Sequence, residues 1–263
     1  MHTKAISYEL CPNDTIVAHL HPKSVPCISW QLLEDLSNVP IILKEYNPTH
    51  LIFRSDHPKV FNLGGDLKLF RESISEKDTK RLREYGYGCV RAVYNLLTSW
   101  DHPVITICDV DGQCLGGGFE GALACDYIIG SENATFGFPE SSFNLFPGMG
   151  AITLLTPIVG EREAIRMCAQ GWSGSSRDAM EKSLIQYSVA ENRRQATIDI
   201  LVAEHQSKWN TYSALRKVKA INAWYMYDKL YEIVDIWVEA AMNLPKDNLD
   251  YIGKLSRAQR LMK

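Results

Sequence analysis

Apolar residues in the first two-thirds of the chain alternate between strand-like and helix-like spacing. Residues 5–10 and 15–21 flank a turn-forming run at 11–14, and this pattern predicts a β-hairpin. A helix is expected from about Ser29 into the forties. Short apolar runs that predict buried strands lie at residues 51–53, 104–108 and 127–129. The second of these runs is of the continuous apolar type, so both of its faces should be covered.

Helical periodicity governs two longer stretches. Residues that fall on one face of a long predicted helix are Leu82, Cys89, Val93, Leu96, Leu97 and Trp100. From about Glu191 onward the chain is expected to be helical, with apolar positions at Trp224, Leu230, Ile233, Val234, Trp237 and Met242. Pro245 interrupts this pattern, and Asp247 is positioned to cap a last helix that carries Ile252 and Leu255.

Strands that alternate with helices indicate the α/β class. No Pro- or Ser-rich linker divides the 263 residues. We therefore expect a core over residues 1–190 and an appended C-terminal helical region over 191–263, rather than two independent domains.

Glycine-rich turns precede two of the predicted helices, at residues 64–65 and 116–118. Glycine lets the backbone approach a ligand closely, and the first amides of a helix have no partner within it. Two such amides aimed at one point form an oxyanion hole, which suits the carbonyl oxygen of a thioester. The duplicated turn is thus a candidate carbonyl-binding site.

Two glutamates follow these turns. Glu120 comes three residues after Gly117, about one helical turn on, in a stretch that is otherwise apolar. Glu140 follows Pro139 in a loop rich in phenylalanine. Apolar surroundings raise the pKa of a carboxyl toward the range that acid–base chemistry needs. The alternative interpretation of Glu120 is a structural glutamate at a helix N-terminus.

Composition excludes several other classes of protein. The net charge is −3 and the basic residues are scattered, which disfavours nucleic-acid binding. The seven cysteines include no C-x-x-C pair, so we expect reduced thiols in a cytoplasmic protein rather than disulfides or a zinc ribbon. No apolar run is long enough to span a membrane, and no secretory signal is evident.

Other candidate motifs are weak. Gly148 and Gly150 precede a helix, but the third glycine of a dinucleotide fingerprint is missing. His19 and His21 share one face of a strand without a third ligand nearby, so no metal site is expected. Cys114 has no partner histidine and is interpreted as a buried small residue. No G-x-S-x-G motif supports a serine thioesterase.

Three segments together resemble the crotonase (enoyl-CoA hydratase/isomerase) superfamily. Residues 116–120 resemble its G-G-G-x-E motif, and residues 136–140 followed by 146–150 resemble its F-G-x-P-E and P-G-x-G motifs. Residues 60–67 resemble its first oxyanion loop. Glu120 and Glu140 also have the twenty-residue spacing found in the hydratases.

The resemblance implies a crotonase-like ββα spiral core with C-terminal helices, and a homotrimer or a dimer of trimers. It implies that the amides of Gly65 and Gly117 form the oxyanion hole. Glu140 would abstract a proton from the α-carbon of a fatty acyl thioester, and Glu120 would protonate the departing β-hydroxyl. No cofactor is implied, because the substrate is carried on coenzyme A or acyl carrier protein.

Within the superfamily, the likeness is strongest to the synthases of diffusible signal factors, which are cis-2-unsaturated fatty acids. It lies in residues 60–67, 118–120, 144–151 and 232–242. That branch implies an acyl carrier protein partner, hydrolysis of the thioester, and an association with the receiver domain of a sensor kinase. Trp237 and Leu255 match residues that line its acyl pocket, and we expect Leu145 and Met149 to contact substrate as well.

The residues leave three hypotheses open. The first is a dehydratase that also hydrolyses 3-hydroxyacyl carrier protein. The second is a conventional enoyl-CoA hydratase, and the third is an inactive crotonase-fold protein that serves as a binding partner. Residues 182–186 depart from the family pattern, which leaves the closing strand of the core undefined.

Overall fold

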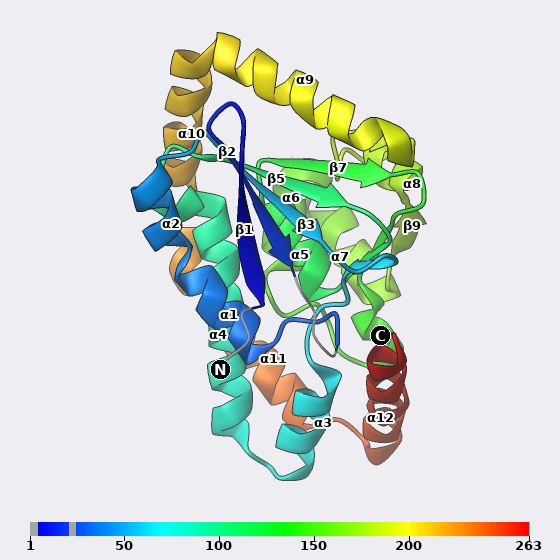
Figure 1. The fold of residues 1–263 in the computed structure, drawn as a ribbon. Helices are drawn as coiled ribbons and strands as arrows, with labels where there is room; N and C mark the ends of the chain where they lie inside the picture. The colour runs from blue at the N-terminus through cyan, green and yellow to red at the C-terminus, as the bar shows by residue number, and fades with distance from the viewer. Residues whose placement is uncertain (1–4, 21–24, 263) are drawn as a thin grey trace.

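The computed structural model describes residues 5–20 and 25–262 (Figure 1). The expected hairpin is present, with β1 (Ile6–Cys11) and β2 (Thr15–Leu20) paired antiparallel. His21, which was expected at the end of the second strand, lies outside the described residues.

A six-stranded sheet has the order β1-β2-β3-β5-β7-β10, and every pair after the hairpin is parallel. The added strands are β3 (His50–Ser55), β5 (Ile105–Val110), β7 (Tyr127–Ser131) and β10 (Tyr187–Val189). All residues of β5 are buried, which confirms the prediction of a strand covered on both faces. β10 is the closing strand that the sequence left undefined.

A second, four-stranded sheet has the order β4-β6-β8-β9. Its strands are β4 (Val60–Asn62), β6 (Gln113–Leu115), β8 (Thr135–Gly137) and β9 (Ser173–Ser175). The chain enters the large sheet, crosses to the small sheet and then forms a helix, three times in succession. The helices that complete these units are α3 (Leu67–Ser75), α5 (Gly117–Ala124) and α6 (Ala151–Val159). This repetition is the expected ββα spiral.

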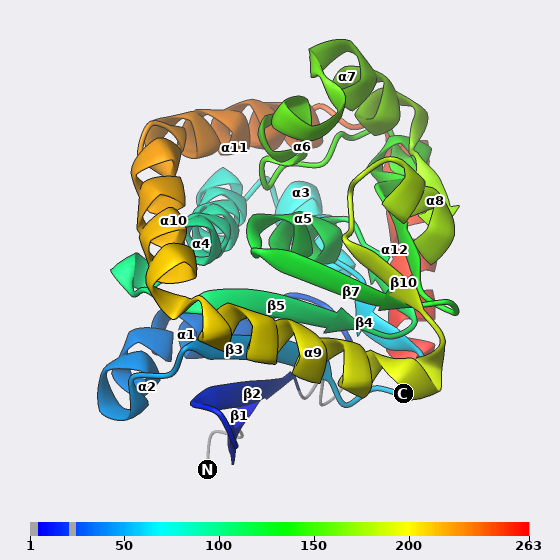
Figure 2. The same cartoon turned by 90° about the horizontal axis from the view of Figure 1, so that it is seen from above.

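Helices cover both faces of the large sheet. On one face α4 (Thr79–Thr98) and α5 pack over the main apolar core, which contains Cys108 and Val110 of β5. On the other face α9 (Arg194–Ser207) runs beside β3, β5 and β7 (Figure 2). Residues of α9 that join Ile105 and Ile107 in a second apolar cluster are Ile198, Leu201 and Val202. Side chains on a strand alternate between faces, so a single strand supplies both clusters.

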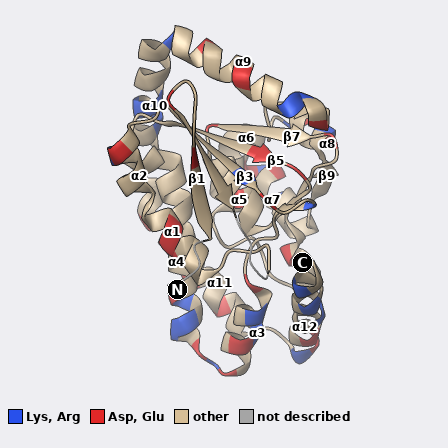
Figure 3. Ribbon diagram, in the orientation of Figure 1, with Lys and Arg blue, Asp and Glu red and all other residues tan. Residues whose placement is uncertain are grey.

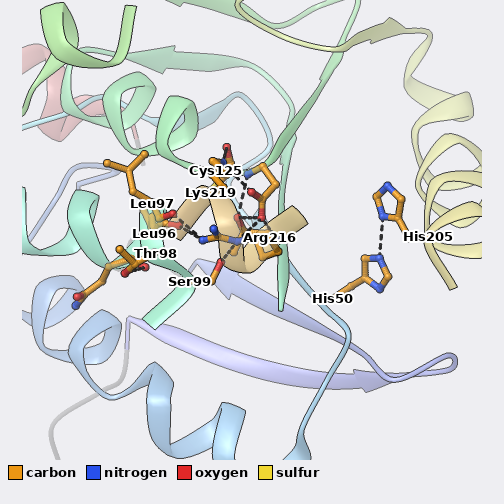
Figure 4. Close-up of polar contacts among 12 residues, drawn as sticks. His50, Leu96, Leu97, Thr98, Ser99, Cys125, His205, Arg216 and Lys219 are labelled. Carbon is orange, nitrogen blue, oxygen red and sulfur yellow. Dashed lines mark hydrogen bonds and ion pairs between the residues drawn. The ribbon is translucent and has the colours of Figure 1, made fainter. Parts of the chain in front are cut away.

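Buried polar contacts fasten the later helices to this core (Figure 4). His50 of β3 and His205 of α9 are fully buried and stacked, with His50 Nε2 3.0 Å from His205 Nδ1. Arg216 donates to the Leu97 carbonyl at 2.6 Å and to Ser99 Oγ at 2.8 Å. Arg216 therefore satisfies carbonyl groups at the C-terminal end of α4, which lack partners within that helix.

The C-terminal region consists of α9, α10 (Trp209–Ala223), α11 (Met226–Met242) and α12 (Lys246–Leu261). Figure 1 shows α3, α11 and α12 gathered at the end of the molecule away from α9. The division of the chain into a core and a lid or oligomerisation region stays a prediction. Asp247 was expected to cap α12, but the helix begins after Pro245 without a side-chain cap, so that expectation was wrong.

Other local expectations also need correction. The helix expected from Ser29 is two helices, α1 (Trp30–Ser37) and α2 (Val39–Tyr46), because Pro40 falls in the first turn of α2 and cannot continue α1. Trp100 does not lie on α4. It belongs to a 3-10 turn (Ser99–Asp101) in which it adopts a left-handed conformation. Trp224, one of the apolar positions expected within the C-terminal helices, lies between α10 and α11 and is 70% exposed.

The remaining helices are α7 (Glu161–Gln170) and α8 (Ser176–Glu181), with 3-10 turns at Pro139–Phe143 and Glu191–Arg193. Acidic and basic residues are intermixed over the ribbon (Figure 3). Among the described residues, no helix has the length and apolar character that crossing a membrane requires.

Candidate active site

Three loops of the spiral meet at one edge of the small sheet. β4, β6 and β8 are parallel neighbours, so their carboxyl ends lie side by side. The turn at Gly64 and Gly65 follows β4, the start of α5 follows β6, and Glu140 follows β8. The glycine turns and the second glutamate, which are far apart in sequence, are thus brought together by sheet register.

The backbone of the glycine turn at residues 64–65 is in close contact with that of the turn at residues 116–118. Gly64 has a φ of 81°, and a β-carbon there would lie 2.8 Å from the backbone nitrogen of Gly117. Asn62 Oδ1 accepts a hydrogen bond from the Gly64 amide at 2.8 Å and holds the turn. Only glycine combines this backbone conformation with so close an approach. The amides of Gly65 and Gly117 consequently lie in adjacent turns.

The start of α5 is equally crowded. Gly116 has a φ of 52°, and a β-carbon there would lie 2.4 Å from Glu140 Oε1. A β-carbon on Gly117 would lie 2.3 Å from the sulfur of Met149. Within the described residues, the amides of Gly65 and Gly117 donate to no protein acceptor. Both are therefore available to an oxygen atom of a ligand.

Glu120 is buried on α5, with 1% of its surface exposed. Its Oε1 accepts hydrogen bonds from the amides of Met149 at 2.9 Å and Ala151 at 2.8 Å, at the N-terminus of α6. Burial and the charge of Glu140 raise the pKa of Glu120 well above its usual value, and the two amides oppose this rise. Glu120 is therefore suited to carry a proton near neutral pH.

Glu140 lies in the 3-10 turn Pro139–Phe143. The loop expected around it therefore contains regular structure, namely the end of β8 and this turn. Burial raises the pKa of Glu140 to about 7. Its Oε2 is buried without a hydrogen-bond partner among the described residues. A carboxyl that ionises near pH 7 and has a free oxygen is suited to accept a proton from a ligand.

A cavity of about 330 Å³ contains both carboxyls. Gly65 and Gly117 also line it, as do three of the four expected substrate contacts, Trp237, Leu255 and Met149. Leu145, the fourth, is buried but does not line the cavity; its backbone nitrogen instead bonds to the Glu140 carbonyl at 3.1 Å. Further apolar groups in the wall are Leu63, Leu67, Phe70, Phe143, Val234 and Met262.

The polar residues of this wall that sequence reasoning missed are Tyr85, Gln113, Ser142, Tyr251 and Gln259. Tyr85 is fully buried on the apolar face of α4, and its hydroxyl donates to the Ile28 carbonyl at 2.5 Å. A tyrosine among the apolar positions of a helix was a usable signal. Gln259 gave no comparable signal, because it sits among charged residues near the end of the chain.

The alternative sites gain little support. Among the described residues, no three His, Cys, Asp or Glu side chains are grouped to hold a metal ion. The ring of His19 contacts Glu9 and Asp56. Cys114 is fully buried and burial raises its pKa well above the usual value, so its thiol stays protonated.

Comparison with known proteins identifies the family of this chain. The family model for enoyl-CoA hydratase/isomerase matches residues 17–231, so the chain belongs to that family. A probable mitochondrial enoyl-CoA hydratase 2 of Arabidopsis thaliana is 30% identical over 169 residues, and the match covers 64% of this chain and 54% of the relative. A fatty acid oxidation complex subunit alpha of Pseudomonas savastanoi is 35% identical over 160 residues, which are 61% of this chain but only 22% of the relative. The chain thus spans about half, or less, of these relatives.

Solved structures share the fold. An enoyl-CoA hydratase from Bacillus halodurans superposes with a TM-score of 0.84 at 21% identity, covering 96% of this chain and all (100%) of the other. An enoyl-CoA hydratase/isomerase from Xanthobacter autotrophicus gives a TM-score of 0.78 at 22% identity, with 98% of each chain covered. These likenesses confirm the expected crotonase-like α/β fold.

Proposed function

We propose that the protein interconverts a 3-hydroxyacyl thioester and its 2-enoyl thioester by removing or adding water. The observation that carries this proposal is the convergence, in one apolar cavity, of the buried Glu120, of Glu140 with its buried Oε2, and of two glycine amides that have no acceptor among the described residues. Family membership supports it, because the named relatives include probable enoyl-CoA hydratases. The cavity wall suits an acyl chain.

In the dehydration direction, Glu140 as a carboxylate takes the proton from the α-carbon. The electron pair of that C–H bond moves toward the thioester carbonyl, whose oxygen accepts hydrogen bonds from the amides of Gly65 and Gly117. Removing one donor from such a hole typically costs about 3–4 kcal/mol of transition-state stabilisation. The electron pair then returns to form the double bond, and the β-hydroxyl leaves as water with a proton from Glu120.

The environment of each carboxyl matches its role. The mechanism starts with Glu120 protonated and Glu140 ionised. The pKa of Glu120 is raised well above its usual value, and the charge of Glu140 contributes to this rise. Glu140 ionises at about 7. One proton shared between two neighbouring carboxyls is thus the favoured state near neutral pH.

We further propose that the substrate is carried on acyl carrier protein and that the same site hydrolyses the thioester, releasing a cis-2-unsaturated fatty acid. The sequence likeness to signal-factor synthases motivates this finer assignment. The unpartnered Oε2 of Glu140 supports it, because a free carboxylate oxygen can activate a water molecule for attack on the carbonyl. The alternatives are a hydratase limited to coenzyme A thioesters and an inactive protein that binds a receiver domain.

Mass spectrometry of reactions with 3-hydroxydodecanoyl carrier protein and 3-hydroxydodecanoyl-CoA separates these possibilities. Release of a free 2-enoic acid, lost in Glu120→Gln and Glu140→Gln, supports the finer proposal. Formation of enoyl-CoA without free acid supports the hydratase alone. The two variants should lose about 100- to 10,000-fold in kcat. Glu84→Gln, an exposed change on α4, is the matched control. Absence of turnover on every thioester would exclude catalysis.

We also propose that the protein forms a homo-oligomer, as the family resemblance implies. The supporting observation is a row of exposed apolar side chains along α10 and its end: Leu215, Val218, Ile221 and Trp224, which are 59%, 51%, 67% and 70% exposed. Large apolar side chains exposed on successive helical turns are typical of a contact with another protein.

A further inference from the structure

We propose that Gln259 of α12 is a positioning residue that holds the Gly65 amide in place for the carbonyl oxygen of the substrate. This inference rests on the proposed function, since it assumes that Gly65 binds that oxygen. It adds a contribution from the C-terminal helix to a site otherwise built by the spiral core.

The side chain of Gln259 contacts two backbone groups around Gly65. Its Nε2 donates to the Gly65 carbonyl at 3.2 Å, and its Oε1 accepts from the Leu67 amide at 3.4 Å. A carboxamide has one end that donates and one that accepts, so only one orientation satisfies both contacts. Gln259 is buried with 7% of its surface exposed, and burial of a long polar side chain is costly without such partners.

Glycine is the residue whose backbone most needs this support. Gly65 has no β-carbon to restrict φ and ψ, and rotation about either bond would re-aim its amide. The peptide before Gly65 is held by the Ile28 amide, which donates to the Gly64 carbonyl at 2.8 Å. The peptide after it is held by the Asp66 amide, which donates to the Tyr85 hydroxyl at 3.1 Å, and by Gln259 on the carbonyl. Gln259 therefore completes the restraint on this turn.

The same helix also covers the cavity. Tyr251, Leu255, Ala258 and Met262 of the C-terminal segment line its wall. Arg260, the next residue after Gln259, lies 3.9 Å from Asp66 Oδ1, and that oxygen caps α3. Enclosure of the acyl chain and orientation of the Gly65 turn thus depend on one docked helix.

The test compares Gln259→Met and Gln259→Glu with Lys254→Met, an exposed change on the same helix. Methionine preserves length and removes both hydrogen bonds. Glutamate retains an acceptor for the Leu67 amide but cannot donate to the Gly65 carbonyl when ionised. We expect kcat to fall about fivefold or more in both Gln259 variants, the effect of about one hydrogen bond, while KM changes less than about twofold. Lys254→Met should match the wild type.

Three results would overturn the inference while the wild type is active. These are an unchanged kcat in both variants, a change confined to KM, or a Gln259→Glu variant with wild-type kcat. Circular dichroism and thermal melting identify a variant that fails to fold, and the other Gln259 variant then decides. An inactive wild type would instead contradict the proposed function, so the two failures are distinguishable.

Discussion

At Glu140, the charge state that the fold favours differs from the one that the proposed chemistry requires. Burial disfavours its charged form and raises its pKa to about 7, while the proposed chemistry requires that charge. No described residue gives its Oε2 a hydrogen bond that would offset the cost. Buried charged groups without hydrogen-bond partners are typical of functional sites. Such sites are less stable than a core optimised for stability alone.

Replacing this carboxyl with an amide should therefore stabilise the fold. The pKa of Glu140 in the folded state lies above its unfolded value of 4.5, so its contribution to stability is complete below pH 4.5 and is lost as the pH rises through about 7. We expect Glu140→Gln to raise the Tm at pH 8 and to leave it nearly unchanged at pH 4.5. Melting curves at the two pH values check this. A Tm lowered equally at both would contradict it.

The reaction rate should depend on pH in the opposite way to the stability of the fold. Acid, which favours the folded state through Glu140, should slow catalysis. Glu140 must be ionised to take the α-proton, so kcat/KM is expected to fall as the pH drops below about 7. At high pH it should fall again as Glu120 loses its proton, because its pKa is raised well above the usual value. A profile of kcat/KM against pH, with Glu84→Gln as control, tests both limbs. A flat profile between pH 5 and 7 would contradict the role of Glu140.

At the scale of elements, α9 is fastened to the large sheet at both ends. Arg194 at its start pairs with the buried Asp109 at 2.8 Å and with Asp111 at 2.6 Å. His205 near its end meets His50. Burial lowers the pKa of both histidines, that of His50 to about 4, so both are neutral in the folded protein near neutral pH.

Acidic pH should weaken the packing of α9 against the large sheet. A histidine whose folded pKa is lowered contributes stability that is complete above about pH 6.5 and is lost as the pH falls toward 4. Protonation of both rings would also place like charges 3.0 Å apart. We expect His205→Gln to show a smaller loss of Tm between pH 6.5 and 4 than the wild type. His102→Gln, a partly exposed control, should keep the wild-type slope.

Elements with strong local patterns were predicted well from the sequence. The hairpin, the buried strands and the glycine turns before α3 and α5 carry their signals within a few residues. The His50–His205 pair was not predicted, because it joins positions 155 residues apart and either histidine alone is unremarkable in its segment. In the site, the two glutamates and two glycines came from compact motifs. Gln259 contributes through packing of α12, which no local pattern encodes.

At the scale of the whole molecule, α10 and its end leave several apolar side chains exposed. The row that ends at Trp224 is the surface on which the proposed self-association rests. Acidic and basic residues are intermixed along the ribbon in the view of Figure 3.

A charge placed in this row should weaken the assembly. We expect the wild type to have a mass of about three times 29.7 kDa, or a multiple of that, and Ile221→Asp to shift toward monomer. Ile41→Asp, an equally exposed isoleucine on α2, should leave the mass unchanged. Size-exclusion chromatography with light scattering measures both. A monomeric wild type would refute the proposal.

The position of α12 also bears on how the protein is made. Synthesis proceeds from the N-terminus at about 5–20 residues per second, and domains generally fold as their chain emerges. The sheets and the glycine turns are complete by residue 189, whereas Gln259 lies 70 residues further along the chain and is translated later. A nascent chain can therefore form the spiral while its cavity still lacks one wall and a restraint on Gly65. The proposed activity would then arise only when α12 docks, so a chain not yet translated as far as α12 would carry the spiral fold without that activity.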